Sequence, residues 1–388
     1  MPTYLSPGVY VEEVPPMVRP ISGVGTSTAG FVGVCPDTPT MPRRPGHPGD
    51  SDGDFYTVAP AGQPVLITTW DDFQNCFGIL EESNQVLARA VYGFFNNGGT
   101  RCWVVRAPDE ETLGDGSQSL EAFEAIDEIA IVAMPGMVTA AQHSALIAHC
   151  EKMADRVAIL DGAPSSGLVP TEIRPVGRSA EASSAGLYFP QIVVYDPLSA
   201  GPLAVDPSGH IAGIYARSDA SRGVFKAPAN EAITGALDLT VKVTQAQQDG
   251  LNPEGINVIR SFSGTITVWG ARTMADDNTP EFRYISTRRY FNYLRSSIIA
   301  GTRWVVFEPN TPSLWQRVTR NVSDFLLNEW RAGGLFGTTP QQAFYVRCDA
   351  TTNPPAVREL GQIVTEIGVA IVKPAEFVIF RIEQITGG

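Results

Sequence analysis

Residues 29–35 read Ala-Gly-Phe-Val-Gly-Val-Cys, an uninterrupted apolar run that has the length of one β-strand. A strand that is apolar on both faces is typical of the centre of a sheet that other elements cover on each side. The repetition of such runs indicates that this part of the chain builds one sheet of buried strands. The others are Val65–Thr68, Cys102–Arg106, Ile129–Met134, Val157–Leu160 and Ile192–Tyr195.

Helical patterns lie between these apolar runs. Gln85–Asn97 places apolar residues at spacings of four and ends in Asn-Asn-Gly-Gly, a strong signal for the end of a helix. Leu120–Asp127 and Ala140–Ala154 have similar patterns. Strands that alternate with helices predict an α/β domain with a mixed, largely parallel sheet, and we expect this domain to span residues 26–260.

The chain beyond residue 260 has a different pattern, which predicts an α+β domain over residues 261–374. A long helix is expected to begin at Pro312 with Thr311 as its N-cap and to end before Gly333-Gly334. An earlier helix is expected to reach Ile299. The expected strands are Gly264–Gly270, Phe282–Thr287, Arg303–Phe307, Ala343–Asp349 and Gln362–Ile371.

Both ends of the chain have the pattern of β-strands without a partner nearby in the sequence. An N-terminal arm, residues 1–25, carries a strand at 4–14 and continues into a Ser/Gly/Thr-rich linker. A C-terminal arm, residues 375–388, is apolar on both faces, as a centrally buried strand would be. The residues expected to form the contacts of these strands are Tyr4, Val9, Tyr10, Val11, Val14, Phe377, Val378, Ile379, Phe380 and Ile382.

A strand on an arm has two possible partners. It can complete a sheet in its own molecule, or it can add to the sheet edge of a neighbouring molecule, where backbone hydrogen bonds supply affinity and alternate side chains supply specificity. These residues by themselves leave both possibilities open. We expect the N-terminal arm to belong with the domain at 261–374.

The charge of the chain is unevenly distributed. The net charge of −13 argues against a nucleic-acid-binding protein with a basic surface. Residues 1–260 hold 15 Lys and Arg against 30 Asp and Glu, whereas residues 261–388 hold 13 against 11, and twelve of those 13 are Arg. Arg is favoured for bidentate pairing at interfaces, although Arg-rich helices can also be solvated faces. The C-terminal third is therefore a candidate contact region.

The sequence contains no arrangement typical of an active site. The four His residues are too dispersed for a metal cluster, and the five Cys residues lack CxxC spacing. Neither a GxxxxGK[ST] phosphate loop nor a GxSxG nucleophile elbow occurs. Asp50, Asp52 and Asp54 lack the Gly and Glu that a calcium loop needs at its sixth and twelfth positions. We therefore expect no catalytic residues, no cofactor and no metal.

Neither a leader peptide nor a membrane helix is indicated. The start Met1-Pro2-Thr3-Tyr4 lacks a basic region and an apolar run, and no stretch approaches the roughly 18 apolar residues of a membrane-spanning helix. We expect the chain to be made and kept in a cytosol, without membrane insertion.

Several phrases spread over nearly the whole chain resemble the tail sheath family of contractile phages and related injection machines. Eight such phrases in the family's order are far more specific than any one of them. They are YLSPGVYVEE (4–13), TSTAGFVG (26–33), WDDF to FG (70–78), AVYGFFNNGG (90–99), PSGHIAGIYAR (207–217) with KAPAN (226–230), STRR (286–289), FEPN (307–310) and KPAEF (373–377).

The resemblance implies a structural and mechanical protein. Sheath subunits of this family form stacked hexameric rings, arranged as a six-start helix around an inner tube, and exchanged terminal strands link them. On triggering, the sheath contracts and drives the tube through a target envelope. By this resemblance the arms at 4–14 and 375–385 join sheets of adjacent subunits, residues 261–374 form the inner domain, and residues 26–260 form an outer domain inserted into it.

The resemblance also implies partners and a place of assembly. The partners are other copies of the chain, the inner tube protein, baseplate proteins and terminator or cap proteins. Assembly would take place in the bacterial cytoplasm, and the product would be a phage tail, a tailocin or an extracellular injection particle. An acidic tube would attract an Arg-rich inner domain. The candidate tube or inter-ring contacts are Arg288, Arg289, Arg295, Arg317 and Arg320.

Two other interpretations compete with a sheath subunit. An α/β enzyme would have its site at the strand ends of residues 26–260, and it would be a discrete molecule that tolerates the loss of residues 1–20. A different tail component, such as a tube or baseplate protein, is the second alternative. Tube proteins are usually much smaller and lack the α/β domain, so the length of this chain disfavours a tube protein.

Overall fold

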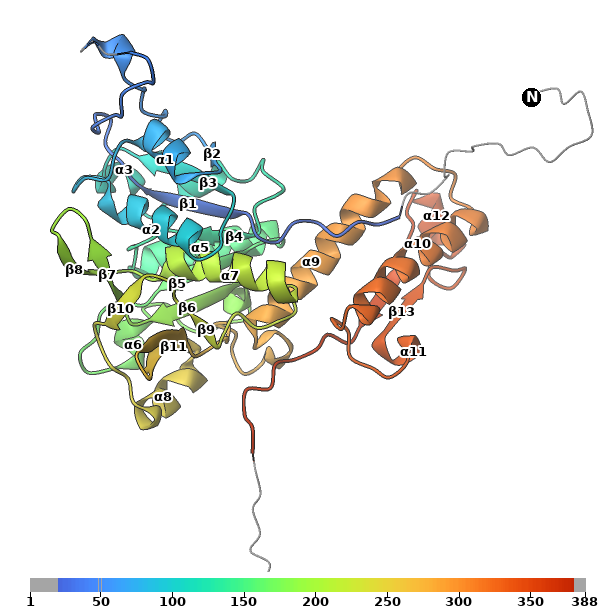
Figure 1. Ribbon diagram of the computed structural model, residues 1–388. Coiled ribbons are helices and arrows are strands. Elements are labelled where there is room, and N and C mark those ends of the chain that lie inside the picture. Colours follow the sequence, from blue (N-terminus) through green and yellow to red (C-terminus); the bar gives the residue numbers. More distant parts are fainter. Residues whose placement is uncertain (1–19, 48, 50, 380–388) are drawn as a thin grey trace, which may run out of the picture. The chain divides into compact units, whose positions relative to one another are not determined.

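The computed structural model describes residues 20–47, 49 and 51–379 (Figure 1). The chain divides into two compact units. In the described part of the chain, the large unit holds residues 23–296 and the segment from Ile371 onward, and the small unit holds residues 20–22 and 297–370. The division falls within helix α9 (Ile285–Thr302).

The large unit is built on a nine-stranded sheet of order β2-β3-β1-β4-β5-β6-β11-β12-β9. The six strands from β3 to β11 are parallel, whereas the pairs β2–β3 at one edge and β11–β12 and β12–β9 at the other are antiparallel. The predicted mixed, largely parallel sheet is therefore confirmed. The strands are β1 (Ala29–Val34), β2 (Val65–Ile67), β3 (Cys102–Ala107), β4 (Ile131–Ala133), β5 (Val157–Asp161), β6 (Ala185–Phe189), β9 (Glu231–Ala232), β11 (Ile256–Phe262) and β12 (Thr265–Val268).

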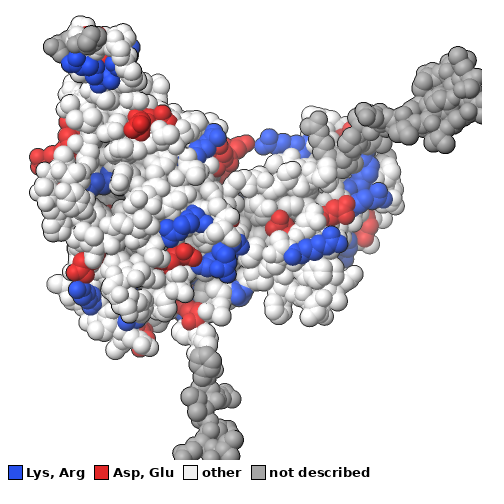
Figure 2. Space-filling view, viewed as in Figure 1, with Lys and Arg blue, Asp and Glu red and all other residues white. Residues whose placement is uncertain are grey.

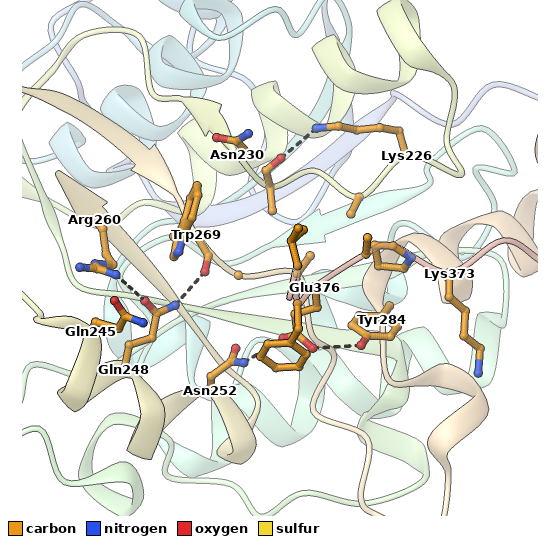
Figure 3. A pocket seen from close by; sticks show the side chains of 18 of the residues that line it. Lys226, Asn230, Gln245, Gln248, Asn252, Arg260, Trp269, Tyr284, Lys373 and Glu376 are labelled. Carbon is orange, nitrogen blue, oxygen red and sulfur yellow. Dashed lines mark hydrogen bonds between the residues drawn. The ribbon is translucent and has the colours of Figure 1, made fainter. Parts of the chain in front are cut away.

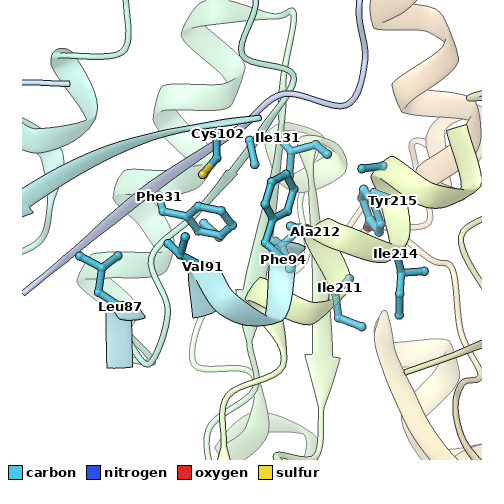
Figure 4. Close-up of a cluster of buried hydrophobic side chains, with 14 of the residues drawn as sticks. Phe31, Leu87, Val91, Phe94, Cys102, Ile131, Ile211, Ala212, Ile214 and Tyr215 are labelled. Carbon is cyan, nitrogen blue, oxygen red and sulfur yellow. The ribbon is translucent and has the colours of Figure 1, made fainter. Parts of the chain in front are cut away.

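The central strands are buried on both faces because alternate side chains enter two different hydrophobic clusters. In β1, Phe31 belongs to one cluster and Val32 to the other. Helices α2 and α7 cover the face of Phe31 (Figure 4), and α5 contributes Leu146 to the cluster of Val32. The helices of this unit up to α8 are α1 (Trp70–Phe77), α2 (Gln85–Asn96), α3 (Glu110–Leu113), α4 (Ser117–Glu121), α5 (Ala140–Met153), α6 (Pro170–Ile173), α7 (Ser208–Arg222) and α8 (Gln245–Leu251).

The predicted helices at Gln85–Asn97 and Ala140–Ala154 are confirmed by α2 and α5. The helix expected at Leu120–Asp127 was placed too late, because α4 ends at Glu121 and turns follow it. The 3-10 helices of the large unit are η1 (Asp52–Asp54), η2 (Glu181–Ser184), η3 (Asn252–Glu254) and η4 (Pro280–Phe282).

Helices α2 and α7 pack with their backbones close together. A Cβ atom added at Gly209 of α7 would lie 2.5 Å from the Cα of Ala90 in α2, and one added at Gly213 would lie 2.7 Å from the Cβ of Asn97. Only a residue without a side chain fits at such a distance. The glycines in the sequence phrase 207–217 therefore allow this contact.

Asp161, at the end of β5, binds the first turn of α7. Its carboxylate accepts hydrogen bonds from the backbone N–H and the hydroxyl of Ser208, at 2.8 and 2.7 Å, and from the N–H of Gly136 at 3.1 Å. Pro207 provides no side-chain cap, so Asp161 supplies from another element what a local N-cap would supply. Burial, together with the nearby Asp206, raises the pKa of Asp161.

A second, three-stranded antiparallel sheet corrects one detail of the prediction. Ile192–Tyr195 does form a strand, but β7 (Ile192–Asp196) pairs with β8 (Gly201–Val205) and β10 (Ala236–Leu239) rather than joining the large sheet. Val193, Val194 and Tyr195 are only partly buried or exposed in it. In the nine-stranded sheet the strands that follow β5 are β6 and β11, and the sequence predicted neither of them.

The small unit contains the long predicted helix, α10 (Pro312–Arg331), which begins after Thr311 and ends before Gly333 as expected. Thr311 makes no side-chain cap hydrogen bond with the helix. Leu314, Val318 and Leu326 are buried along one stripe of α10. The other elements are η5 (Arg303–Val305), α11 (Pro340–Ala343), β13 (Phe344–Arg347), α12 (Pro355–Glu359) and β14 (Glu366–Val369), and β13 pairs antiparallel with β14.

Two predicted strands are wrong. Phe282–Thr287 is the end of η4 and the start of α9, because Ile285 is buried in the core and its N–H bonds to the carbonyl of Ala271. Arg303–Phe307 begins as η5 and continues as a turn in which Phe307 has a φ of 68°, outside the range of a strand. The strand at Gly264–Gly270 is confirmed by β12, and those near 343 and 366 by β13 and β14.

The boundary expected at residue 260 cuts through a continuous sheet. Ile259–Phe262 of β11 pairs with Thr265–Val268 of β12, so the large unit continues beyond 260 to Ser296. Of the described arm residues 20–25, residues 20–22 group with the small unit, where Ile21 packs against Gly301, and residues 23–25 belong to the large unit. Among the residues that the structure describes, no helix has the length and apolar character needed to span a membrane.

Candidate assembly surfaces

Most of the predicted arm residues lie outside the described part of the chain. These are Tyr4, Val9, Tyr10, Val11 and Val14 of the N-terminal arm, and Phe380 and Ile382 of the C-terminal arm. The described arm residues Phe377, Val378 and Ile379 are exposed by 69%, 70% and 80% and belong to no strand in the single chain. Three consecutive apolar side chains that face solvent form a surface that another strand or sheet can cover.

The segment before these residues lies on the large unit. Val372–Val378 lines one side of a groove of about 790 Å³ (Figure 3). The other side comes from the loop before β9, from α8 and η3, from the β11–β12 hairpin and from Tyr284, which precedes α9. The residues of this side that Figure 3 labels are Lys226, Asn230, Gln245, Gln248, Asn252, Arg260, Trp269 and Tyr284.

Glu376 attaches this segment to the groove. Its carboxylate accepts hydrogen bonds from Nε and Nη2 of Arg272, both at 2.8 Å, from the amide of Asn252 at 2.8 Å and from the hydroxyl of Tyr284 at 2.9 Å. The side chains of Glu376 and Arg272 are only 19% and 14% exposed. Burial raises the pKa of Glu376, but the hydrogen bonds from Arg272 and Asn252 outweigh it, so the net pKa lies below its usual value.

Arg272 is itself held in place by a buried residue of β11. The side-chain oxygen of Asn257 accepts from the N–H of Arg272 at 2.7 Å, and its amide donates to the carbonyl of Arg272 at 2.8 Å. Asn257 is fully buried. The guanidinium also donates to the carbonyl of Asn252 at 3.2 Å. The buried Asn257 therefore fixes the backbone of Arg272, and the guanidinium of Arg272 extends to Glu376.

Arg289, one of the five candidate arginines, is used within the subunit. Its guanidinium makes two hydrogen bonds to the carboxylate of Asp219, at 2.8 and 2.6 Å, and one to the carbonyl of Thr26 at 3.0 Å. It also stacks on the ring of Tyr215, 4.6 Å from the centroid. Because the side chain is only 3% exposed, Arg289 does not face the surface in the folded chain.

The other four candidate arginines lie nearer the surface. On α9, Arg288 is partly buried over the ring of Phe282, and Arg295 is exposed and donates to the carbonyl of Ala154 at 2.9 Å. On α10, Arg317 lies over the ring of Trp304 and pairs with Glu308 at 3.5 Å, and Arg320 is exposed.

Several arginines of the C-terminal third pair within the chain. Arg272, Arg289, Arg317 and Arg347 each have a carboxylate partner in the same unit. Residues 297–370 contain six Arg against six Asp and Glu, so this part of the chain carries no net charge. Figure 2 accordingly shows basic and acidic side chains mixed on the visible face of the small unit.

The two-stranded sheet of β13 and β14 is a second candidate surface. Phe344 pairs with Val369 and Arg347 with Glu366, and among the described residues neither strand pairs with a third strand. Tyr345 is 59% exposed. A short sheet with open edges is a suitable acceptor for an added strand.

The described residues contain no group of three or more His, Cys, Asp or Glu side chains that could hold a metal ion. Burial lowers the pKa of His143, His149 and His210 to about 4, so these three imidazoles are neutral at pH 7. Asp161, at the carboxyl end of a central parallel strand, is engaged by Ser208 and Gly136 as described above.

Comparison of structures identifies the class of protein. The fold matches the helical sheath of the anti-feeding prophage in its contracted state, with a TM-score of 0.77 and 29% identity, and the match covers 98% of this chain and 100% of that one. The sheath complex of the extracellular contractile injection system PVC, also contracted, matches with a TM-score of 0.74 and 28% identity over 99% of both chains. The chain thus has the architecture of a contractile sheath protein.

Sequence comparison agrees. Residues 111–274 match the phage tail sheath protein central domain, and residues 277–385 match the phage tail sheath C-terminal domain. The chain belongs to the phage tail sheath family, as its sequence phrases predict. The tail sheath protein of Vibrio phage KVP40 is 30% identical over 177 residues, which are 45% of this chain and 25% of that protein. The chain therefore spans about a quarter of the length of this curated relative.

The sequence did not predict the residues that hold the C-terminal segment. Glu376 lies in the phrase KPAEF, but its partners Asn252, Arg272 and Tyr284 are about 90 to 125 residues away in the chain. No spacing rule links positions so far apart. The signal that was available is the position of a carboxylate directly before the apolar run Phe377–Phe380.

Proposed function

We propose that this chain is the sheath subunit of a contractile tail or injection particle. In this proposal it polymerises as stacked hexameric rings, in a six-start helix around an inner tube, and contracts from a metastable extended state to drive the tube through a target envelope. The observation that carries the proposal is the similarity to contractile sheaths over 98% of the chain at 29% identity. The stored energy would lie in subunit interfaces, so no hydrolysis by this chain is required.

The arms are proposed to link the subunits. The N-terminal strand at 4–14 and the C-terminal strand at 375–385 would each add to a sheet of a neighbouring copy, and the open edges of β13 and β14 are the proposed acceptors. The exposed side chains of Phe377, Val378 and Ile379 support this proposal, since they have no cover in the single chain. Strand exchange would keep the subunits connected while their bodies rearrange.

Electron microscopy tests the proposal. The full-length chain and a variant that lacks residues 1–20 would be expressed alone and with an inner tube protein, and each would be viewed in negative stain. We expect ribbed tubes or stacked rings from the full-length chain only. Discrete particles from both would favour the alternative of an α/β enzyme with its site at the strand ends of the large unit.

The proposed partners are other copies of the chain, the inner tube, baseplate proteins and terminator proteins, with assembly in the bacterial cytoplasm. Arg320 is our leading candidate for a contact with the tube or with the next ring, because it is exposed on α10; Arg288, Arg295 and Arg317 remain candidates too. Arg320→Glu should abolish sheath assembly around the tube and leave the subunit folded. Lys242→Glu makes the same charge change at an exposed site on the large unit and should assemble normally.

Circular dichroism would establish that both charge-reversal variants are folded, and electron microscopy of the co-expressed particles would give the result. Particles of normal length and contractility from Arg320→Glu would remove Arg320 from the contact region.

A further inference from the structure

The attachment of Glu376 marks a change in how the C-terminal segment is exposed. Before it, partly buried and exposed residues alternate along Val372–Glu376, as in a segment that lies against a surface. After it, Phe377, Val378 and Ile379 are all exposed, with Phe377 and Val378 at the border of the groove. The change occurs at the one carboxylate that three side chains of the large unit bind.

The polar contacts between residues 372–379 and the rest of the described large unit are those of the Glu376 carboxylate. A bidentate pair between Arg and a carboxylate is among the strongest hydrogen-bonded contacts in proteins and fixes direction as well as distance. Asn257 orients the Arg272 backbone from the core, so the pair connects the segment to the central sheet rather than to a loose surface side chain.

We propose that Arg272, Asn252 and Tyr284 form a carboxylate receptor that fixes the point at which the C-terminal arm leaves its own subunit, so that exchange between subunits begins only after Glu376. The inference rests on the proposed strand exchange and specifies it. Residues 371–376 stay with their own large unit, and residues 377–388 reach the neighbouring copy. The three receptor residues are positioning residues, because they act on the arm through Glu376.

A fixed departure point has a mechanical consequence. If the segment from 371 onward were loose, its effective length would increase by several residues, each up to about 3.3–3.6 Å long when extended. The reach of the arm would then no longer be defined, and the concentration of the strand at its acceptor would fall. The receptor keeps the arm short and directed while the subunit bodies move.

The test compares two variants that each remove one carboxylate charge. Glu376→Gln removes the charge at the receptor. Glu124→Gln, the control, removes it from an ion pair with Lys152 at the surface of the large unit. Chymotryptic cleavage after Phe377 would be measured by mass spectrometry on the full-length chains, and on peptides of residues 371–379 with the same residue at position 376. Relative to the matching peptide, we expect cleavage to be about tenfold faster in the Glu376→Gln chain and unchanged in Glu124→Gln. A protease needs a segment that has come off the surface, and hydrogen bonds to charged groups are the strong ones that hold it there.

Electron microscopy of the same variants gives the second readout. Glu376→Gln should form sheaths that are shorter or fewer than those of the unmodified chain, with an unchanged circular dichroism spectrum, and Glu124→Gln should assemble normally. Unchanged cleavage after Phe377, or normal sheaths from Glu376→Gln, would overturn the inference. Failure of the unmodified chain to form sheaths would instead contradict the proposed function, while the cleavage measurement would still decide whether the receptor holds the segment.

Discussion

Thr26, Asp219 and Arg289 form one buried hydrogen-bonded group in the large unit. Asp219 accepts from the hydroxyl of Thr26 at 2.6 Å and from the guanidinium of Arg289, whose side chain is almost completely buried. Removing one partner of a buried ion pair leaves a charge without compensation, which typically costs ~3–5 kcal/mol. We therefore expect Asp219→Ala to lower the free energy of unfolding of the large unit by about that amount.

Urea unfolding followed by tryptophan fluorescence measures this effect. Arg295→Ala is the control, since Arg295 is exposed on the same helix as Arg289, and its effect should stay within about 0.5 kcal/mol. A loss of less than about 1 kcal/mol in Asp219→Ala would contradict a structural role for Arg289 within the subunit.

At the scale of residues, the sequence could identify the arginines of α9 and α10 but not their surroundings. Arg288 and Arg289 are neighbours in the sequence, yet only Arg289 meets Asp219, which lies 70 residues earlier. The partner of an ion pair depends on tertiary contacts that neither composition nor spacing records. The same reason explains why Glu376 was part of a predicted strand while its receptor was not predicted.

The contact between α2 and α7 gives a prediction at the scale of elements. Gly209→Ala would place a Cβ against the backbone of Ala90, where neither helix has room to accept it. Overpacking of this kind costs ~1–3 kcal/mol. Gly250→Ala, within α8, meets no atom within 4 Å and should stabilise its helix by about 0.5–1 kcal/mol.

Thermal unfolding of both glycine variants checks this prediction, and the two changes should shift the melting temperature in opposite directions. Equal melting temperatures for the two variants would mean that α2 and α7 can separate without cost, contrary to the close packing of their backbones at Gly209.

At the scale of elements, the sequence predicts buried strands and capped helices well because their signals are local. The apolar run at β1 and the double glycine after α10 both needed only a few residues to be recognised. Phe282–Thr287 misled because a short segment of aromatic and β-branched residues also fits the start of a helix that buries Ile285. Strand β11 was missed although it lies inside the sheet, between β6 and β12, and the domain boundary was consequently placed too early.

At the scale of the whole molecule, charge alone does not direct the small unit toward an acidic partner. Its residues 297–370 are balanced at six Arg and six acidic residues, whereas residues 23–296 carry 19 Lys and Arg against 31 Asp and Glu. The excess of basic over acidic residues counted for residues 261–388 thus comes from residues 261–296, which belong to the large unit. Contacts with a tube would depend on individual exposed side chains such as Arg320 rather than on a net positive field.

Exchanged terminal strands are proposed to link copies of this chain into a sheath, and every other property proposed for the assembly depends on that linkage. A helical reconstruction of the sheaths by cryo-electron microscopy tests it most directly, because it follows the path of each arm. We expect residues 371–376 to lie on their own large unit and residues 377–388 to pair with a sheet of a neighbouring copy. Arms that fold back on their own subunit throughout the sheath would contradict the proposal.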